Sequence, residues 1–374
     1  MNVFNRYIIK NLLLATVFIT ATLSAVIILT QSLRFLELII ESGADTKTFW
    51  LLTFLALPRF WEVIIPIALM IATTFTYNRL KDTSELVIMR GTGFSPLKIA
   101  RPAILLGLFF TTALWGITLW GTPQSLNYLQ KLKQIVSSQF SVMLLHENVF
   151  NRIGKDFIVY VQKRDSNGSL SGVVIHDQSQ DAPSTILAKH GQLSEQDGNY
   201  QVIVYDGSRQ VFDAENNVLQ RLNFERYIID LPLTQEIKKR WKEPDERSLE
   251  ELLHPNPNVL RDVEHTQKFK VELHRRLCAP LLALAFTLIA ASSLILGPVR
   301  RHQTNWRTFY IIIGSVMIQG MFIGVYNYAQ NNATGIIAMY AVPLLPIIAS
   351  IYLLSPIGEK SRRKLLYTTA EAQS

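Results

Sequence analysis

The residues NLLLATVFITATLSAVIILTQSL, Asn11–Leu33, contain no Asp, Glu, Lys or Arg. The hydrocarbon core of a bilayer is about 30 Å thick, so a helix that crosses it needs about 20 residues. Four further runs of the 374-residue chain also lack these charged residues: Val63–Asn78, Pro102–Gln130, Leu277–Val299 and Thr308–Gly358. Because no soluble fold needs so many apolar runs of this length, the sequence predicts an integral membrane protein.

Six membrane helices are expected, because the run Thr308–Gly358 is too long for one span and is divided by the polar residues 330–335. A membrane-interface helix, Thr48–Leu57, is expected before the second span, where Arg59 and Glu62 lie three residues apart and can pair on one helix face. The apolar run that follows Met1–Lys10 is longer than that of a signal peptide, which predicts a retained first helix. The predicted spans cover about residues 11–32, 60–80, 97–121, 277–297, 307–329 and 336–356.

Between the third and fourth spans, the chain becomes charged and alternates polar with apolar residues. Short strands separated by turn signals, such as those at 165–168, 197–199 and 206–207, suggest an antiparallel sandwich or jelly roll. The predicted strands are Phe157–Gln162, Ser171–His176, Thr185–Lys189, Gln201–Tyr205, Gln210–Phe212 and Leu219–Leu231, and the predicted flanking helices are Gln124–Asn148, Thr234–His254 and Val263–Arg276. The predicted fold class is therefore a six-helix membrane protein with an inserted all-β, jelly-roll-like domain. Its predicted domains are 1–130 (three spans), 131–276 (the β domain with flanking helices) and 277–374 (three spans and a basic tail).

The charge is distributed unevenly. Residues 131–276 hold 20 Lys and Arg against 21 Asp and Glu, whereas the remainder holds 17 against 8. Basic residues in short loops mark the cytoplasmic side of a membrane protein, so this excess indicates topology and does not indicate nucleic-acid binding. In a six-span arrangement every basic cluster lies on one side. Both termini are therefore predicted to be cytoplasmic, and the central domain to lie on the far side of the membrane.

The motifs exclude several kinds of chemistry. Cys278 is the one cysteine, so no intrachain disulfide forms. The seven histidines show no metal-ligand spacing, and neither GxSxG nor the phosphate-binding GxxxxGK[ST] occurs. We therefore predict no enzyme activity, no metal and no cofactor in this chain. If it carries out energised transport, ATP is bound by a partner.

The segment Arg79–Arg101 joins the second and third spans on the basic side. Asp82 with Glu85 fits a capping box, Gly91 and Gly93 fit a helix end, and Ser95-Pro96 fits the start of another helix. The pattern predicts a short amphipathic helix at about 82–92. Two readings stay equally open: a surface helix that only connects two spans, and a docking helix for a cytoplasmic partner.

Three stretches together resemble a known family: SELVIMRGTGFS (Ser84–Ser95), YNRL (Tyr77–Leu80) and LHRRLCAP (Leu273–Pro280). They are similar to the LptF/LptG permeases of the lipopolysaccharide exporter, and the resemblance covers nearly the whole chain. Two shorter stretches, Thr30–Leu36 and Val149–Asn151, are more similar to the LptF branch.

The resemblance implies the permease of an ABC transporter in the Gram-negative inner membrane. The implied partners are a homologous permease (LptG), two copies of the ATPase LptB, and LptC and LptA, which receive lipopolysaccharide through the β domain. The resemblance also implies that Glu85 lies in a coupling helix seated in a groove of the ATPase, with Arg90 on the same helix. The candidate coupling residues are Asp82, Glu85, Leu86, Met89 and Arg90.

A phosphorylated lipid needs an apolar wall with a basic rim at headgroup level. Five basic residues fall near the predicted outer ends of spans and are candidate headgroup contacts: Arg34, Lys131, Lys133, Arg275 and Arg276. The alternative for each is an interfacial anchor whose charge reaches the water. Two other functions remain as rivals, a membrane-anchored sensor or envelope-assembly scaffold and a secondary transporter. The secondary transporter is disfavoured because such proteins usually carry ionisable residues in mid-membrane.

Overall fold

The chain forms two compact units in the computed structural model, which describes residues 3–42, 45–143, 147–153, 157–165, 169–178, 183–196, 199–213, 218–230, 240–297 and 306–359. The helical unit comprises Met1–Ser32, Thr53–Leu129 and Lys242–Ser374, and the second unit comprises Leu33–Leu52 and Gln130–Trp241. Residues from Lys242 to Arg276, which the sequence analysis grouped with the β domain, therefore lie in the helical unit.

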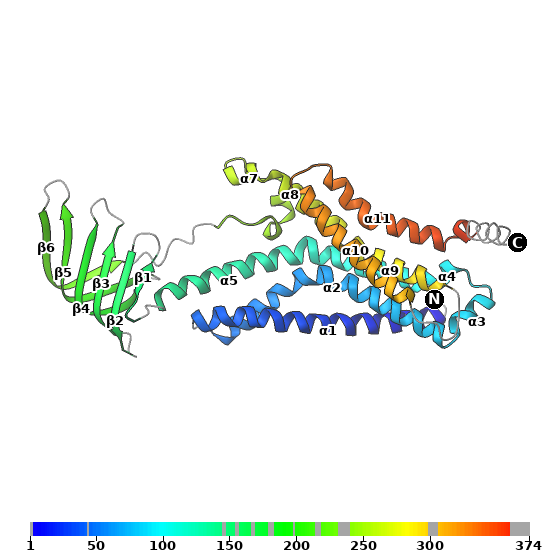
Figure 1. The fold of residues 1–374 in the computed structure, drawn as a ribbon, viewed down its shortest axis with the longest axis horizontal. Coiled ribbons are helices and arrows are strands. Elements are labelled where there is room, and N and C mark those ends of the chain that lie inside the picture. Colours follow the sequence, from blue (N-terminus) through cyan, green and yellow to red (C-terminus); the bar gives the residue numbers. More distant parts are fainter. Residues whose placement is uncertain are drawn as a thin grey trace. The chain divides into compact units, whose positions relative to one another are not determined.

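Long helices dominate the helical unit (Figure 1). Among the described residues, five helical segments are long and apolar enough to cross a membrane, and the bent pair α8–α9 makes a sixth, in agreement with the predicted six spans. The long elements are α1 (Val3–Ser42), α2 (Thr46–Asp82), α4 (Pro96–Gly116) with the π-helical turn η1 (Ile117–Gly121) and α5 (Thr122–Met143), α9 (Leu281–Ile295), α10 (Trp306–Ala329) and α11 (Gly335–Leu354). The short elements are α3 (Glu85–Gly91), η2 (Pro244–Glu246), α6 (Leu249–Leu253), α7 (Leu260–Glu264) and α8 (Thr266–Cys278).

Two local helix predictions differ from the structure. The predicted interface helix Thr48–Leu57 and the second span are one continuous helix, α2, which passes through Pro58 and Pro66. The predicted helix Thr234–His254 is not a single helix: residues 240–254 form an irregular segment with η2 and α6, and residues 234–239 lie outside the described part. A charged, helix-favouring composition was overridden there by the tertiary contacts of this segment.

Helix α9 lies at the centre of the helical unit, since 11 of its 15 residues are buried. Small side chains allow its neighbours to approach closely, as is usual between membrane helices. A Cβ atom on Gly107 of α4 would lie 3.2 Å from Leu284 Cδ1 and 3.3 Å from Thr287 Cβ of α9. Helix α1 is the opposite case, because only 11% of its most apolar segment is buried.

The second unit contains one antiparallel sheet, which confirms the predicted inserted all-β domain. Its strands lie side by side in sequence order (Figure 1). Two predicted strands, Gln201–Tyr205 and Gln210–Phe212, are parts of one strand, so the predicted turn at Asp206-Gly207 lies inside that strand. The strands are β1 (Phe150–Ile153), β2 (Phe157–Arg164), β3 (Ser169–Asp177), β4 (Ser184–Gln196), β5 (Asn199–Asp213) and β6 (Val218–Asp230).

A crease crosses the middle of this sheet. Gly172 of β3 and Asp206 of β5 have positive φ values of 65° and 51°, and the strand register places Lys189 of β4 between them. A side chain at Gly172 would meet Gln162 on β2, so only glycine fits there. In β3 the alternation of buried and less buried residues shifts by one residue at the crease: Leu170 is buried before it, and Val173 and Ile175 are buried after it. The sheet therefore bends at this row and keeps apolar residues buried on both sides of it.

Candidate functional site

Helix α3 follows α2 directly, and its start differs from the predicted capping box. Asp82 is the last residue of α2, and the N-cap of α3 is Ser84, which has a left-handed backbone (φ 63°) and no side-chain cap. Thr83 Oγ1 donates a hydrogen bond to Glu85 Oε1 at 3.0 Å. The Asp82–Glu85 capping box is therefore wrong, because α2 continues through Asp82, about two residues past the predicted end of the second span. The predicted end at Gly91 and the Ser95 cap of α4 are confirmed.

One face of α3 is fixed to the helical unit. Leu86 and Met89 are buried in the apolar cluster that also contains residues of α2, α4 and α9. Arg90 Nη1 donates a hydrogen bond to the backbone oxygen of Gly297, two residues after α9, at 3.2 Å. The opposite face is open: Val87 is exposed, and Ile88 is 64% exposed. Helix α3 thus has a clamped inner face and an exposed apolar outer face.

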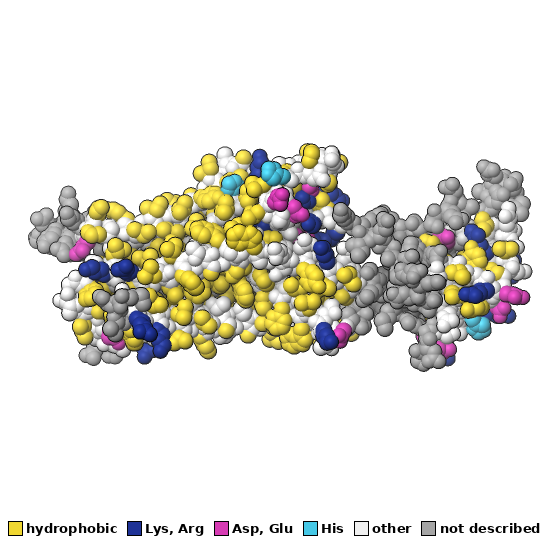
Figure 2. Space-filling model, turned by 180° about the vertical axis from the view of Figure 1, so that it is seen from behind, with side chains coloured by type: hydrophobic (Ala, Val, Ile, Leu, Met, Phe, Trp, Pro, Cys, Tyr) yellow, Lys and Arg dark blue, Asp and Glu magenta, His cyan; other side chains and the backbone are white. Residues whose placement is uncertain are grey.

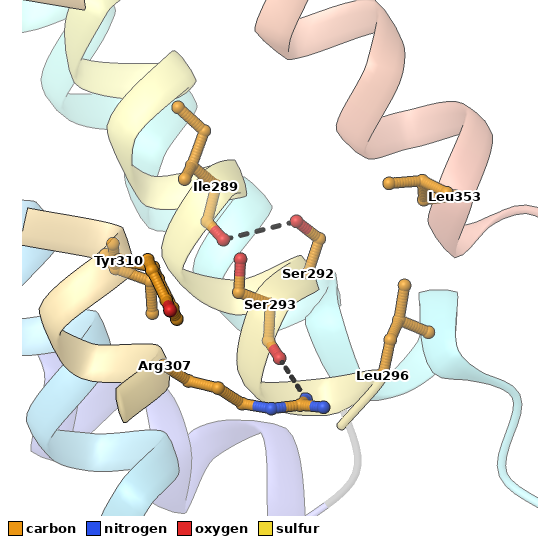
Figure 3. A pocket seen from close by; sticks show the side chains of 8 residues that line it. Ile289, Ser292, Ser293, Leu296, Arg307, Tyr310 and Leu353 are labelled. Atoms are coloured by element: carbon orange, nitrogen blue, oxygen red, sulfur yellow. Dashed lines mark hydrogen bonds between the residues drawn. The ribbon is translucent and has the colours of Figure 1, made fainter. Parts of the chain in front are cut away.

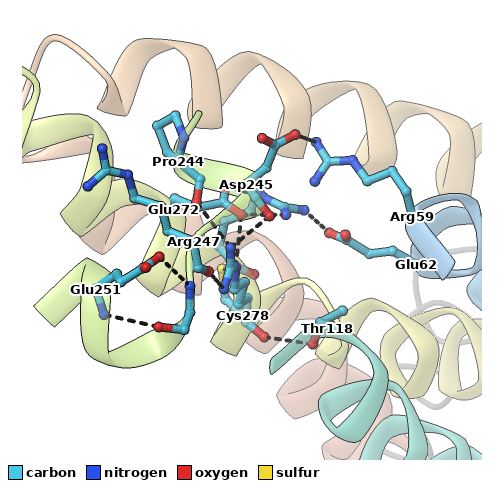
Figure 4. A network of polar contacts seen from close by, with 12 residues as sticks. Arg59, Glu62, Thr118, Pro244, Asp245, Arg247, Glu251, Glu272 and Cys278 are labelled. Atoms are coloured by element: carbon cyan, nitrogen blue, oxygen red, sulfur yellow. Dashed lines mark hydrogen bonds and ion pairs between the residues drawn. The ribbon is translucent and has the colours of Figure 1, made fainter. Parts of the chain in front are cut away.

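A second candidate site is a buried network of ionic side chains where α8 meets α2 (Figure 4). Arg275 makes a two-bond contact with Glu272, from Nε to Oε2 at 2.7 Å and from Nη2 to Oε1 at 2.8 Å, and Arg275 Nη1 also donates to Glu62 of α2. Arg276 Nε donates to Glu272 Oε1 at 3.0 Å. Glu272 is therefore shared by two arginines, and α8 is joined to α2.

The other nitrogens of Arg276 bind residues 240–254, the segment with η2 and α6 that covers α8 and is called the covering segment below. They donate to the backbone oxygens of Arg247 at 2.8 Å, Pro244 at 3.1 Å and Asp245 at 3.0 Å. The side chain of Arg276 is fully enclosed, with 1% exposure. Because all these nitrogens have hydrogen-bond acceptors and Glu272 supplies a negative charge, the desolvation penalty of the buried charge is offset.

Two further ion pairs complete the network. Arg247 makes two bonds to Asp262, at 2.9 Å and 2.7 Å, and its guanidinium lies 4.4 Å from the centre of the Phe269 ring. Arg59 lies 3.9 Å from Asp245. Four acidic groups thus face four arginines. The predicted Arg59–Glu62 pair is wrong, because Arg59 pairs with Asp245 and Glu62 pairs with Arg275.

The covering segment has an ion pair of its own outside the predicted spans. Lys242 Nζ lies 2.7 Å from Glu251 Oε1, and Ser248 and Glu251 form a capping box at the start of α6. Partial burial acts to raise the pKa of Glu251, but the hydrogen bond and charge of Lys242, the backbone N–H of Ser248 and the charge of Arg247 together hold this pKa below its usual value. The ion pair between Lys242 and Glu251 therefore holds in place the segment whose backbone carbonyl groups bind Arg276.

Next to the network, Pro280 interrupts the helix between α8 and α9, which are bent by 40°. Proline has no N–H, so the break leaves backbone oxygens of the preceding turn without their usual helical donors. Trp115 Nε1 donates to the oxygen of Leu277 at 2.8 Å, and Thr118 Oγ1 lies 3.4 Å from that of Arg276. Both donors come from the end of α4 and the π-helical turn η1. Side chains of α4 and η1 thus donate hydrogen bonds to the backbone oxygens that the break between α8 and α9 leaves without helical donors.

The predicted headgroup residues lie in different environments. Arg275 and Arg276 are inside the network, which is unlike the exposed rim that the sequence suggested. Arg34 of α1 and Lys131 of α5 are exposed, and Lys133 Nζ lies 5.1 Å from the centre of the ring of Phe35, the neighbour of Arg34. The structure thus brings together two pairs, Arg275 with Arg276 and Lys133 with the Arg34–Phe35 region of α1.

Sequence reasoning missed most of the acidic members of the network, Glu272, Asp245 and Asp262, and it missed Arg247. A local signal was available in Glu272, Arg275 and Arg276, because residues three and four positions apart face each other on a helix. No local signal points to Arg247 and Asp262, whose pairing depends on the fold of the covering segment.

The family model for the lipopolysaccharide export system permease LptF/LptG matches residues 6–356. The chain belongs to the LptF/LptG family. It is 27% identical over 361 residues to an uncharacterized protein of Rickettsia prowazekii, covering 95% of this chain and 99% of that protein. It is 22% identical over 364 residues to the lipopolysaccharide export system permease protein LptG of Haemophilus influenzae (92% and 93% covered), and 20% identical over 373 residues to LptG of Escherichia coli K12 (93% and 94% covered).

Family membership confirms the resemblance and makes the chain a multi-pass membrane permease of the lipopolysaccharide export type. The two named relatives above are LptG proteins. The greater similarity of Thr30–Leu36 and Val149–Asn151 to the LptF branch of the family therefore stays a prediction.

Proposed function

We propose that this permease is one half of the membrane part of an ABC transporter that extracts lipopolysaccharide from the inner membrane and passes it to a periplasmic bridge. A homologous permease, LptG if this chain is of the LptF branch, forms the other half, and two copies of the ATPase LptB bind ATP and drive the cycle. Support comes from the family match over residues 6–356 and from the arrangement of the long helices.

The observation that carries this proposal is the two-faced helix α3. Its exposed residues Val87 and Ile88, with Glu85 in the first turn, form the surface on which the ATPase docks. Its buried residues Leu86 and Met89 transmit movement into the helical unit. A motor subunit needs such a rigid element, because its domain motion must reach the spans through few contacts.

The orientation follows from charge. Basic residues gather at the end of the helical unit that carries α3, whereas Lys and Arg are mixed with Asp, Glu and His at another part of its surface (Figure 2). By the preference of positive loops for the cytoplasm, α3 and both termini are cytoplasmic and the sheet domain is periplasmic. The basic residues at the α3 end include Arg79, Lys81, Arg90, Lys98, Arg101 and Arg307.

The exposed face of α1 and the edges of the sheet fit the proposed transporter. The exposed apolar face of α1 is covered by lipid or by the second permease, because an apolar helix surface avoids water. In the described sheet, β1 and β6 are the edge strands, and an edge strand is a template for adding another strand. LptC and LptA therefore extend this sheet in the proposed assembly, and lipopolysaccharide passes along it.

The docking proposal is tested with Glu85→Lys and Ile88→Glu in the complete complex. Both variants should insert into the membrane normally but lose most co-purifying LptB and, with it, ATP-driven release of lipopolysaccharide. Lys47→Glu is the control, a charge reversal of the same size at the exposed first turn of α2, whose other end leads to α3.

Undiminished LptB binding and lipid release in both α3 variants would contradict the docking role. If the wild-type chain co-purified with neither an ATPase nor a second permease, the membrane-anchored scaffold would be the better reading.

A further inference from the structure

A pocket of about 400 Å³ opens between α9, α10 and α11 (Figure 3). Its walls combine aliphatic side chains with a few polar groups, and none of the described residues that line it is acidic. The residues that matter for its chemistry are Arg307, Tyr310 and Ser293 on the polar side and Ile289, Leu296 and Leu353 on the apolar side.

Arg307 gives the pocket a positive charge. Its Nη1 atom donates to the backbone oxygen of Ser293 at 3.0 Å, near the end of α9. Among the ion pairs formed within the described part of the chain, none includes Arg307. The adjacent residues 298–305 contain no Asp or Glu, so this neighbouring segment supplies no carboxylate. As far as the described residues show, the charge of Arg307 is thus available to an anion from outside the chain.

The aromatic residues around Arg307 mark its depth in the membrane. Trp306, Phe309 and Tyr310 are all exposed, with ring centroids 6.0 Å apart in the first pair and 6.2 Å in the second. Tryptophan and tyrosine gather at the level of lipid headgroups. The pocket therefore opens at the depth where phospholipid phosphates lie, on the same side of the helical unit as α3.

We propose that this pocket binds the headgroup of an anionic phospholipid from the leaflet on the α3 side, with phosphatidylglycerol as the representative. The guanidinium of Arg307 and the phenol of Tyr310 bind the phosphate, and the positive first turn of α10 adds to this attraction. Ile289, Leu296 and Leu353 accommodate the start of the acyl chains. This inference depends on the proposed orientation in the membrane and not on which lipid is exported.

The position of the pocket gives the bound lipid a consequence for coupling. The Arg307 guanidinium lies directly against Gly297, whose backbone oxygen accepts the bond from Arg90 of α3. Two arginines, one from α3 and one from α10, thus hold the end of α9. A phosphate on Arg307 competes for the donor that binds Ser293, so anionic lipid acts on the contact between α10 and the end of α9, next to the residue that Arg90 binds.

The test is native mass spectrometry of the delipidated permease–ATPase complex, titrated with phosphatidylglycerol or with phosphatidylcholine of the same acyl chains. The wild type should retain phosphatidylglycerol selectively. Arg307→Gln should weaken that binding by roughly tenfold, as expected for loss of one charge-assisted contact. Arg101→Gln is the matched control. Arg101 is an exposed arginine near the start of α4, and it does not line the pocket.

Tyr310→Phe guards against a folding defect, because Tyr310 is 66% exposed and its hydroxyl is not needed for packing. This variant should also bind phosphatidylglycerol less tightly, by roughly threefold. Equal retention of both lipids by the wild type, or unchanged binding by both variants, would overturn the proposal. So would displacement of the lipid by millimolar inorganic phosphate, which would indicate a site for free anions.

If Arg307→Gln released the ATPase while leaving lipid binding intact, Arg307 would serve a protein contact instead, and the lipid proposal would be wrong. Failure of the docking proposal is separable, since loss or retention of LptB in the Glu85 variants does not alter lipid selectivity at this pocket.

Discussion

Helices α1 and α9 are both apolar and yet lie in opposite environments. Helix α9 is almost entirely buried and is rich in Ala, Ser and Thr, whereas α1 exposes large residues such as Val17, Phe18 and Leu29. In a membrane, lipid chains are as apolar as leucine, so hydrophobicity alone does not decide which helix is central. Side-chain size contributes to the difference, because small residues such as those of α9 let helices approach and gain packing contacts. The large residues of α1 are left for lipid or for a second permease.

The largest expected difference between α1 and the central region formed by α8 and α9 concerns acidic residues. Glu272→Ala leaves Arg275 and Arg276 buried without their shared carboxylate, and removal of one partner from a buried ion pair costs about 3–5 kcal/mol. Glu37→Ala on the exposed surface of α1 should change the stability by about 0.5 kcal/mol or less. Thermal unfolding of both variants in detergent measures the contrast. A similar loss in both would mean that the network does not hold the central region together.

A smaller effect is expected from overpacking. Ala290→Leu inserts a larger side chain into the fully buried surface of α9 and should destabilise the protein by about 1–3 kcal/mol. Ala21→Leu makes the same change on the exposed part of α1 and should be nearly neutral in the isolated chain. The midpoints of unfolding of the two variants test this directly. If Ala290→Leu were tolerated as well, close packing of small residues would not explain the central position of α9.

The smallest contrast concerns two tryptophan hydrogen bonds. Trp115 binds the backbone oxygen of Leu277 at the helix break, whereas Trp61 of α2 binds Ser24 Oγ of α1 at 3.2 Å. Interhelical hydrogen bonds in membranes contribute about 0.6 kcal/mol on average, so Ser24→Ala should cost about that much. Trp115→Phe should cost about 1–3 kcal/mol, because it leaves the backbone oxygen of Leu277 at the helix break without its donor. Equal costs would show that the oxygens at the break find other donors.

Features carried by local composition could be predicted from the sequence. The spans follow from runs without charge, the end of α3 from Gly91, and the start of α4 from Ser95-Pro96. The strands follow from alternation, although Asp206-Gly207 resembled a turn because a left-handed residue is also needed at the crease of a sheet. The local sequence indicated that a residue with a left-handed backbone was needed at Asp206-Gly207, but the tertiary structure decided whether it formed a turn or the crease of the sheet.

Features that depend on distant partners could not be predicted in the same way. Glu62 and Arg275 are 213 positions apart, and local spacing suggested Arg59 as the partner of Glu62 instead. The short helix α3 was correctly expected between two spans, but its first residue was not, because α2 itself continues to Asp82. Pairing and helix length are properties of the whole helical unit.

The buried arginines also bear on how the fourth span finds its direction during insertion. Its apolar stretch has basic residues on both sides, Arg275 and Arg276 before it and Arg300, Arg301 and Arg307 after it. The positive charges that flank this span therefore give the translocation machinery no clear instruction. Glu272 and Glu62 cancel the charge at one end, and Glu62 belongs to a span that is synthesised earlier. The contact with Glu62, on a span that precedes this one in the chain, therefore offsets positive charge that the flanking sequence of the fourth span would otherwise carry at both ends.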